Sequence, residues 1–285
     1  MQLQETDHFV SIDTASVVAV GVHLSERLLE IFPNANKEAD ALGLACNTLQ
    51  KLYDGQFARF QAADTPYHNL EHTLQVSVCL MRMIQGAFLK GECVIKLQDV
   101  MDVLLASFCH DIGYFKERGD AKGTGAKYAA YHEARGALLA SEYLTDQGLP
   151  WPRVQVIQRY ILSTGTHRAL RYIGFKTPTE ALLARMLVTA DILAQMSDPN
   201  YLDRLPFLFL EFQESDDYLN IPIHQRRYPD LESLQSATPS FWEHIHRDCL
   251  KVDCDSVYHY LNRPMPSGEN FYLQSVAKWY QNAAG

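Results

Sequence analysis

Apolar residues recur every three or four positions along much of this chain, which is the spacing of one face of an α-helix. The first such stretch runs from Ala15 to Phe32, with Ser25 as its one polar interruption. The face expected to be buried carries Val18, Val22, Leu28, Leu29 and Phe32. The pattern predicts a helix that packs through this stripe.

Further stretches with helical periodicity follow, whereas the alternating pattern typical of strands is scarce. They are Ala39 to Phe60, His68 to Phe88, Leu97 to Cys109, Tyr131 to Gln147, Val154 to Leu162, Pro178 to Met196 and Leu205 to Gln213, with a last helical pair within Phe241 to Tyr260 and Asn270 to Asn282. Proline and glycine separate several of them, and we find no internal repeat. We expect an all-α fold in which residues 41–285 form one domain and residues 1–40 a helical extension packed on its core.

Composition narrows the range of partners. The chain has 285 residues, of which 47% are hydrophobic and 21% charged, so it can bury a full core. Its formal net charge is −9, whereas a protein that binds a nucleic-acid polymer usually carries a basic surface. A nucleic-acid polymer is therefore a disfavoured partner, but a small phosphate ester neutralised by bound metal needs no such surface.

The cysteines and the N-terminal region indicate a compartment. None of the six cysteines forms a CxxC pair, and several lie in apolar stretches where a thiol packs as a small hydrophobic group. No basic start followed by an apolar run and a cleavage site is present, and the run from Val17 to Val22 is too short to span a bilayer. We expect a cytoplasmic protein without a membrane partner.

The strongest chemical signal is the segment YHNLEHTLQV, in which His68 and His72 are four residues apart. Four residues make about one helical turn, so both imidazoles are expected on one helix face. A second signal is His110 followed by Asp111 at the end of the apolar stretch LLASFCHD. Adjacent residues do not share a helix face, but the last turn of a helix can open and direct both side chains at one ion.

Asp191 is a third signal, because it interrupts the apolar stretch MLVTADILAQM. A buried carboxylate needs a partner, and Arg185 alone could supply one. Taken together, four residues form a set of nitrogen and oxygen donors suited to Zn, Mn, Fe or Mg, namely His72, His110, Asp111 and Asp191. The joint pattern favours a metal site over four separate structural roles.

This order of His, His-Asp and Asp resembles the HD superfamily of metal-dependent phosphohydrolases. The string YHNLEHTLQV is similar to the YHNxxHxxxV signature of class I 3',5'-cyclic-nucleotide phosphodiesterases. TADILAQMSDP resembles the segment around that family's last metal-binding aspartate, and FLFLEFQESDD looks like the acidic helix that follows it. The resemblance covers roughly Phe57 to Trp242 and implies a helical bundle of the HD and phosphodiesterase type with a dinuclear metal site.

The resemblance implies a role for each matched residue. The first of two divalent ions (Zn, Mn, Mg or Fe) would be held by His72, His110, Asp111 and Asp191. Asp111 would also bridge to the second ion, and a hydroxide between the two ions would attack the phosphorus. His68 would be the general acid that protonates the leaving alkoxide, since it lies one turn from His72 without being a ligand.

Two departures from the phosphodiesterase pattern leave the second ion and the substrate open. The chain continues after its His-Asp pair as IGYFKERGD, without a second His–Gly cluster, and His132 and His167 resemble the extra ligands of the wider HD superfamily. Glu133 could hold an imidazole in one tautomer. The base-reading pattern of the phosphodiesterases has Phe three residues after a glutamine, but Gln235 has Thr238 at that offset. A cyclic nucleotide is therefore one option among several.

Side chains near the motifs are candidates for binding the phosphate of a substrate. They are Lys116, Arg168 and Gln195. The glycine-rich segment from Gly119 to Gly125 could form a lid over the site. We expect a nucleotide-like phosphodiester or phosphomonoester as the substrate, and a homodimer is possible.

Two other functional classes use the same residues. Four histidines and two aspartates match the ligand set of HD-type di-iron oxygenases, although a general acid such as His68 argues for hydrolysis. Some HD-like domains are non-catalytic signalling modules that have lost their ligands, but this chain retains all four of the core ones. Metal-dependent hydrolysis of a small phosphate ester is the leading hypothesis.

Overall fold

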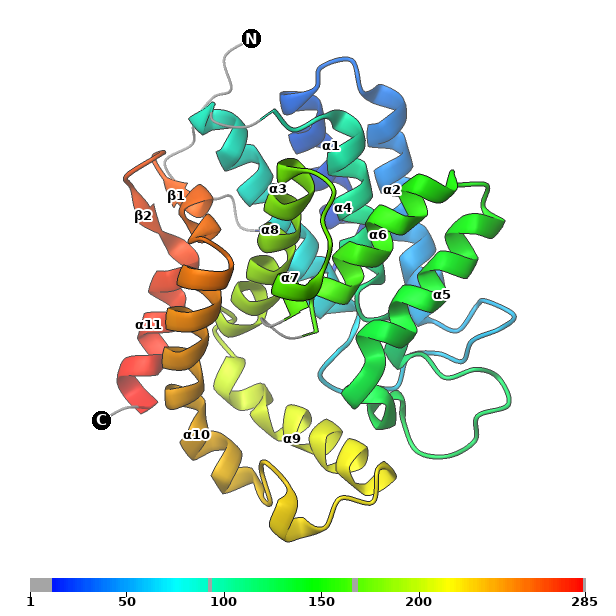
Figure 1. Cartoon of the computed structure of the whole chain (residues 1–285), viewed down its shortest axis with the longest axis vertical. Coiled ribbons are helices and arrows are strands. Elements are labelled where there is room, and N and C mark those ends of the chain that lie inside the picture. Colours follow the sequence, from blue (N-terminus) through cyan, green and yellow to red (C-terminus); the bar gives the residue numbers. More distant parts are fainter. Residues whose placement is uncertain (1–11, 92–93, 166–168, 284–285) are drawn as a thin grey trace.

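The computed structural model describes residues 12–91, 94–165 and 169–283, and its regular structure is almost entirely helical (Figure 1). The first helices are α1 (Val17–Ile31), α2 (Asn36–Tyr53), α3 (Leu70–Lys90), α4 (Leu97–Cys109), α5 (His132–Asp146) and α6 (Trp151–Ser163). They are followed by α7 (Ala169–Tyr172), α8 (Pro178–Met196), α9 (Tyr201–Tyr218), α10 (Leu231–His244) and α11 (Phe271–Ala283). The all-α expectation is confirmed.

Short elements join these helices. The 3₁₀ helices are η1 (Ile112–Tyr114), η2 (Gly125–Tyr131), η3 (Ile223–Gln225) and η5 (Val257–Leu261), and η4 (Ile245–Asp253) is a π-helix. The two-residue strands β1 (Asn262–Arg263) and β2 (Glu269–Asn270) pair antiparallel, with Asn262 opposite Asn270 and Arg263 opposite Glu269. This hairpin leads into α11, which lies beside α10 along one side of the molecule (Figure 1).

Two helices begin and end where the sequence predicts, and a third ends earlier. The stretches Leu97 to Cys109 and Pro178 to Met196 are helices from end to end. The stretch from Ala39 to Phe60 is helical only to Tyr53. It ends there because Gly55 follows with a φ of 69°, a left-handed conformation that turns the chain away from the helix.

The buried stripe of α1 is rotated relative to the expected one. Val20 and Leu24 are fully buried, whereas Val18 and Val22 are 68% and 52% exposed. Both sets follow the same helical period from neighbouring valines, so periodicity alone could not choose between them. The expectation for Val18 and Val22 was therefore wrong, and the stripe that packs includes Leu28.

α1 and α2 pack against each other, and α1 also packs against α3. The hydroxyl of Ser25 donates a hydrogen bond to the carbonyl of Ala39 at 2.8 Å, so the one polar residue of the α1 stripe joins the two helices. Residue 40 lies inside α2, and both helices contribute to the same buried cluster as α3. α1 and α2 are thus part of the common core.

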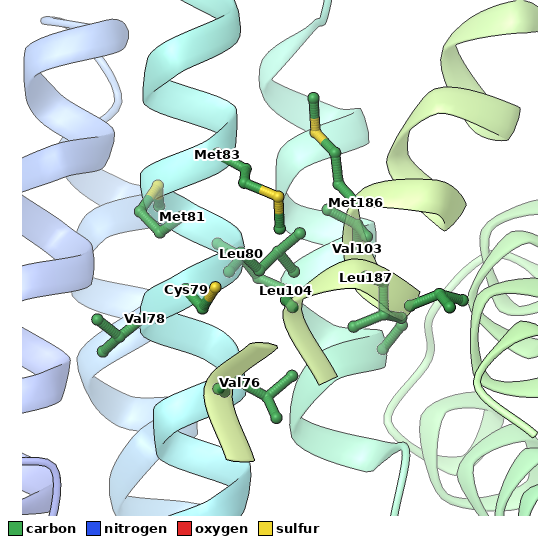
Figure 2. Packing of buried hydrophobic residues seen from close by; sticks show 14 of the residues in the cluster. Val76, Val78, Cys79, Leu80, Met81, Met83, Val103, Leu104, Met186 and Leu187 are labelled. Atoms are coloured by element: carbon green, nitrogen blue, oxygen red, sulfur yellow. The ribbon is translucent and has the colours of Figure 1, made fainter. Parts of the chain in front are cut away.

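α3 is the central helix, and nearly every residue from His72 to Ala87 is buried. It packs against α1, α4 and α8, and Figure 2 shows side chains of α3, α4 and α8 meeting, among them Leu80, Leu104 and Leu187. In the described ranges, no helix combines the length and the hydropathy needed to cross a membrane. α3 is thus buried over most of its length, and the His motif lies at its start.

Candidate metal centre

The first motif enters α3 through a capped turn. The helix begins at Leu70, so His68 precedes it, and Asn69 is the N-cap residue. The side-chain oxygen of Asn69 accepts a hydrogen bond from the backbone N–H of His72 at 3.1 Å, which fixes the first turn. His68 and His72 therefore do not share a helix face as expected, but the turn still brings their ring centroids within 5.6 Å of each other.

His110 and Asp111 lie where α4 ends. His110 keeps helical dihedral angles, whereas Asp111 leaves them with a φ of −102° and a ψ of 3°. The Asp111 carboxylate consequently approaches its neighbour, and its Oδ2 atom lies 3.3 Å from Nε2 of His110. The carbonyl of Ser107 occupies the other ring nitrogen, Nδ1, at 2.8 Å. Nε2 of His110 is thereby the nitrogen presented to the carboxylate.

Asp191 joins this pair from α8. Its Oδ1 atom lies 3.2 Å from Nε2 of His72 and 3.7 Å from Nε2 of His110. The Oδ2 atom of Asp111 lies 3.4 Å from Nε2 of His72. The structure thus brings together the four residues that the sequence analysis assigned to the first ion, on α3, at the end of α4 and on α8.

These distances suit a cation. Ligand atoms at about 2.0–2.1 Å from a tetrahedral ion are roughly 3.3 Å from one another. His72, His110 and Asp111 each offer a ligand atom within 4.8 Å of the other two. The Oδ2 atom of Asp111 is buried and has no hydrogen-bond partner among the described residues, which is unfavourable unless a cation neutralises it. The donor set fits a divalent metal ion.

The electrostatics of the cluster keep its carboxylates ionised. Burial alone would raise the pKa of Asp111, but the imidazoles around it, His110 first, hold that pKa well below its usual range. Burial also raises the pKa of Asp191, yet hydrogen bonds from His110 and His72 lower it below its ordinary value. Burial lowers the pKa of His110, and the two carboxylates reverse this and raise it well above its ordinary value. Ionised carboxylates are the form that binds a cation.

His132 approaches the other oxygen of the same carboxylate. Its Nε2 atom lies 3.6 Å from Oδ1 of Asp111, and the carbonyl of Ala129 lies 2.8 Å from its Nδ1 atom. The two oxygens of Asp111 therefore face different imidazoles, as the oxygens of a carboxylate that bridges two ions would. Glu133, the candidate for orienting an imidazole, has its Oε1 atom 3.5 Å from Nε2 of His132. His167 lies outside the described residues.

Tyr114, which the sequence analysis did not single out, stacks on two of these histidines. Its ring stacks on His68 with centroids 4.7 Å apart and on His132 with centroids 4.4 Å apart. The interplanar angles are 14° and 22°, so the tyrosine ring is nearly parallel to each of the two imidazoles. Such stacking restricts the orientation of both imidazoles. A tyrosine three residues after a His-Asp pair carries no local signal of this role.

Glu211 of α9 is a second residue that the sequence analysis did not name, although it quoted the segment that contains it. Its buried carboxylate accepts hydrogen bonds from the backbone N–H groups of Tyr67 at 2.7 Å and His68 at 3.1 Å. Its Oε2 atom lies 2.5 Å from Nδ1 of His68. Burial lowers the pKa of His68, but the Glu211 charge, aided by Asp111 and Asp191, raises it to about 9. The available signal was an acidic residue at an inward position of FLFLEFQESDD.

Lys116 anchors the glycine-rich segment. It is buried, with its Nζ atom 2.6 Å from Oδ2 of Asp64 and donating to the carbonyl of Gly123 at 2.7 Å. Glu214 of α9 accepts hydrogen bonds from the backbone N–H and the hydroxyl of Thr124. The segment expected to form a lid is thus held by ion pairs and hydrogen bonds from both sides.

Gln195 lies one helical turn beyond Asp191. Its Oε1 atom accepts a hydrogen bond from the hydroxyl of Tyr67 at 2.9 Å, so it supports the residue before His68. Arg168, the third candidate for binding substrate, lies outside the described residues. Substrate binding by these three side chains stays a prediction.

Comparison with known proteins adds one partial match. A family described as Npun_R2479-like matches residues 55–122. That range holds the first motif and the His-Asp pair, and it ends before α5, α8 and α9. A search of curated proteins finds no match.

Proposed function

We propose that this chain is a metal-dependent phosphohydrolase that cleaves a small, nucleotide-like phosphodiester or phosphomonoester. Two divalent ions would be held by His72, His110, Asp111, Asp191 and His132. The support for this is a buried set of nitrogen and oxygen donors whose mutual distances suit a cation. When bound, such ions supply an activated water molecule and neutralise charge on the phosphate.

The observation that carries the proposal is the pairing of His68 with Glu211. Their contact uses Nδ1 of His68, so Nε2 is the ring nitrogen that can hold a transferable proton. The carboxylate also favours the protonated ring, because its charge raises the pKa of His68 to about 9. An alkoxide leaves poorly until it is protonated, and a protonated imidazole beside the metal ligands meets that need.

The surrounding residues hold this acid in place. Glu211 is fixed by two backbone N–H groups, and Tyr114 stacks on the ring of His68. A catalytic group whose neighbours restrict it to one orientation loses little entropy in the reaction. Tyr114 and Glu211 would therefore act as positioning residues for His68.

The same donors also suit the second class, a di-iron oxygenase, and one experiment separates the two. The purified chain is analysed for metal content and screened for hydrolysis of cyclic nucleotides, nucleoside monophosphates and bis-p-nitrophenyl phosphate. Two ions per chain with cleavage of an ester support the proposal. Two irons with oxygen uptake and without hydrolysis would replace it with the oxygenase, and failure to retain added metal would exclude both.

A further inference from the structure

Two buried thiols that the proposed function does not use meet in the C-terminal part of the chain. The Sγ atoms of Cys249, in η4, and Cys254, just after it, lie 3.9 Å apart. The two residues are 1% and 0% exposed. A disulfide has an S–S distance of about 2.05 Å, so the sulfurs need to approach by less than about 2 Å to bond.

The backbone holds this contact in place. The N–H of Cys254 donates to the carbonyl of Cys249 at 2.8 Å, and the N–H of Ser256 donates to the carbonyl of Leu250 at 2.9 Å. Asp255 and Ser256 then adopt φ values of 54° and 56°, in the left-handed region that side chains disfavour. Two such residues in succession persist only where the surrounding structure enforces them. The wide turn of the π-helix and this strained turn together keep the thiols adjacent.

We propose that Cys249 and Cys254 form a redox site, in which a hydroperoxide oxidises the two thiols to an intrachain disulfide that dithiols reduce again. The other described cysteines are Cys46, Cys79 and Cys109. They serve as internal references, because a general oxidation of thiols would affect them as well.

The two thiols also affect each other electrostatically, because their sulfur atoms are in contact. When one of them ionises, its thiolate is the nucleophile and the other thiol lies beside it to complete the disulfide.

The reaction with hydrogen peroxide balances in two steps. The sulfur of one of the two cysteines attacks one peroxide oxygen, the O–O bond breaks, and the departing hydroxide takes up the thiol proton as water, which leaves a sulfenic acid. The sulfur of the other cysteine then attacks the sulfenic sulfur, the S–O bond breaks, and the second thiol proton leaves with the hydroxide as water. Two thiols and one hydrogen peroxide thus give one disulfide and two waters.

The site adjoins the helix that carries a proposed metal ligand. The thiol of Cys254 faces the side chain of Thr189, which is buried in α8 two residues before Asp191. The proposal does not depend on catalysis, because neither thiol is one of the proposed metal ligands. It can therefore fail or succeed independently of the proposed function.

The test is a mass measurement on the full chain under native conditions. The protein is reduced, freed of reductant, treated with hydrogen peroxide, alkylated after denaturation and digested with trypsin. Trypsin cleaves after Lys251, so a disulfide between the two cysteines links peptide 248–251 to peptide 252–278. We expect this linked pair, two hydrogens lighter than its reduced parts, and we expect it to vanish when dithiothreitol is added before alkylation.

Matched variants identify the partners. Cys249→Ser and Cys254→Ser should each abolish the linked pair, and Cys109→Ser should leave it unchanged. If a serine variant does not fold, the linked peptides of the wild-type protein still identify both cysteines. If peroxide oxidises Cys109 while Cys249 and Cys254 are still fully alkylated, their thiols are not a preferred site of oxidation, and the proposal is overturned. A disulfide to another cysteine, or a sulfinic acid at either of the two cysteines in place of the disulfide, would overturn it as well.

Discussion

The Nδ1 atom of His68 lies 2.5 Å from the Oε2 atom of Glu211, although 143 residues separate them in the chain. The other oxygen of this carboxylate is bound to the backbone of Tyr67 and His68, so Glu211 fixes both the main chain and the ring. Glu211 therefore has two effects on His68 that can be measured. It orients the imidazole, and its charge favours the protonated form of that imidazole.

Replacing Glu211 should therefore weaken catalysis selectively. For Glu211→Gln we expect a decrease in kcat of roughly 10- to 100-fold with esters whose leaving group needs a proton, the range found for residues that orient a catalytic group. p-Nitrophenolate leaves without taking up a proton, so the kcat for p-nitrophenyl esters should fall much less. Metal content should not change. The exposed Asp203→Asn on the same helix is the control, and equal losses for the two kinds of ester would contradict the assignment.

Removal of the shared carboxylate should empty the metal centre. Asp111 faces the imidazoles of His72 and His110 through one oxygen and that of His132 through the other. Asp111→Ala should therefore remove the ions from both positions. Elemental analysis should then find well below one metal ion per chain. Asp146→Ala, at an exposed position of α5, should retain the wild-type content. A variant at position 111 that keeps two ions would remove Asp111 as the bridging ligand.

The turn after Asp111 should not tolerate a side chain at Gly113. A Cβ atom there would lie 1.8 Å from the carbonyl oxygen of His132 and 2.9 Å from the backbone nitrogen of Gly136. Because backbone atoms cannot move aside cheaply, Gly113→Ala should lower the free energy of unfolding by about 3 kcal/mol or more, or prevent folding. Urea unfolding measures this difference.

Gly119 provides the matched control for that substitution, since a Cβ atom there meets nothing within 4 Å. Gly119→Ala should change the free energy of unfolding by less than about 1 kcal/mol. A similarly small effect at position 113 would show that η1 and α5 are not packed backbone to backbone as described.

His23 should make stability depend on pH. Burial, helped by the charges of Arg82 and Arg27, lowers its pKa from 6.5 to about 3. Below pH 6.5 the unfolded chain binds a proton at this residue that the folded chain does not. The stabilising contribution of neutral His23 is thus complete above pH 6.5 and is lost progressively as the pH falls toward 3.

The measurement compares unfolding free energies at pH 7 and pH 5. His23→Gln carries no titrating group at this position and should lose less stability over that interval than the wild type, by at most about 2 kcal/mol. His259→Gln, at an exposed position, should follow the wild type. Identical pH dependence of the His23 variant and the wild type would mean that His23 is not held neutral.

The positions of many helices could be predicted from hydrophobic periodicity and from the residues at helix ends. α8 was located to the residue because Thr177 caps its start and Pro178 occupies its first turn, where a proline has no hydrogen bond to lose. The choice between Val18 and Val20 on α1 was not readable, since it depends on where α2 and α3 lie. Periodicity defines a stripe, and tertiary packing decides which of two equivalent stripes is buried.

The candidate site divides in the same way. His72, His110 and Asp111 belong to short motifs whose spacing reports on one turn of helix or one helix end. Tyr114 and Glu211 acquire their places only through packing against other helices, so their contacts with the histidines have no counterpart in local sequence. Sequence analysis therefore named His68 and the proposed metal ligands, and missed Tyr114 and Glu211, which contact His68.

The order of these residues along the chain has a consequence for metal binding during synthesis of the protein. Of the helices that carry these residues, α3 and α4 precede residue 112, whereas α8 and α9 follow it by many residues. A nascent chain that has left the ribosome only as far as α6 has the imidazoles of His72 and His110 but neither Asp191 nor Glu211. Its metal affinity should consequently rise late in synthesis, when the second half of the chain docks onto α3.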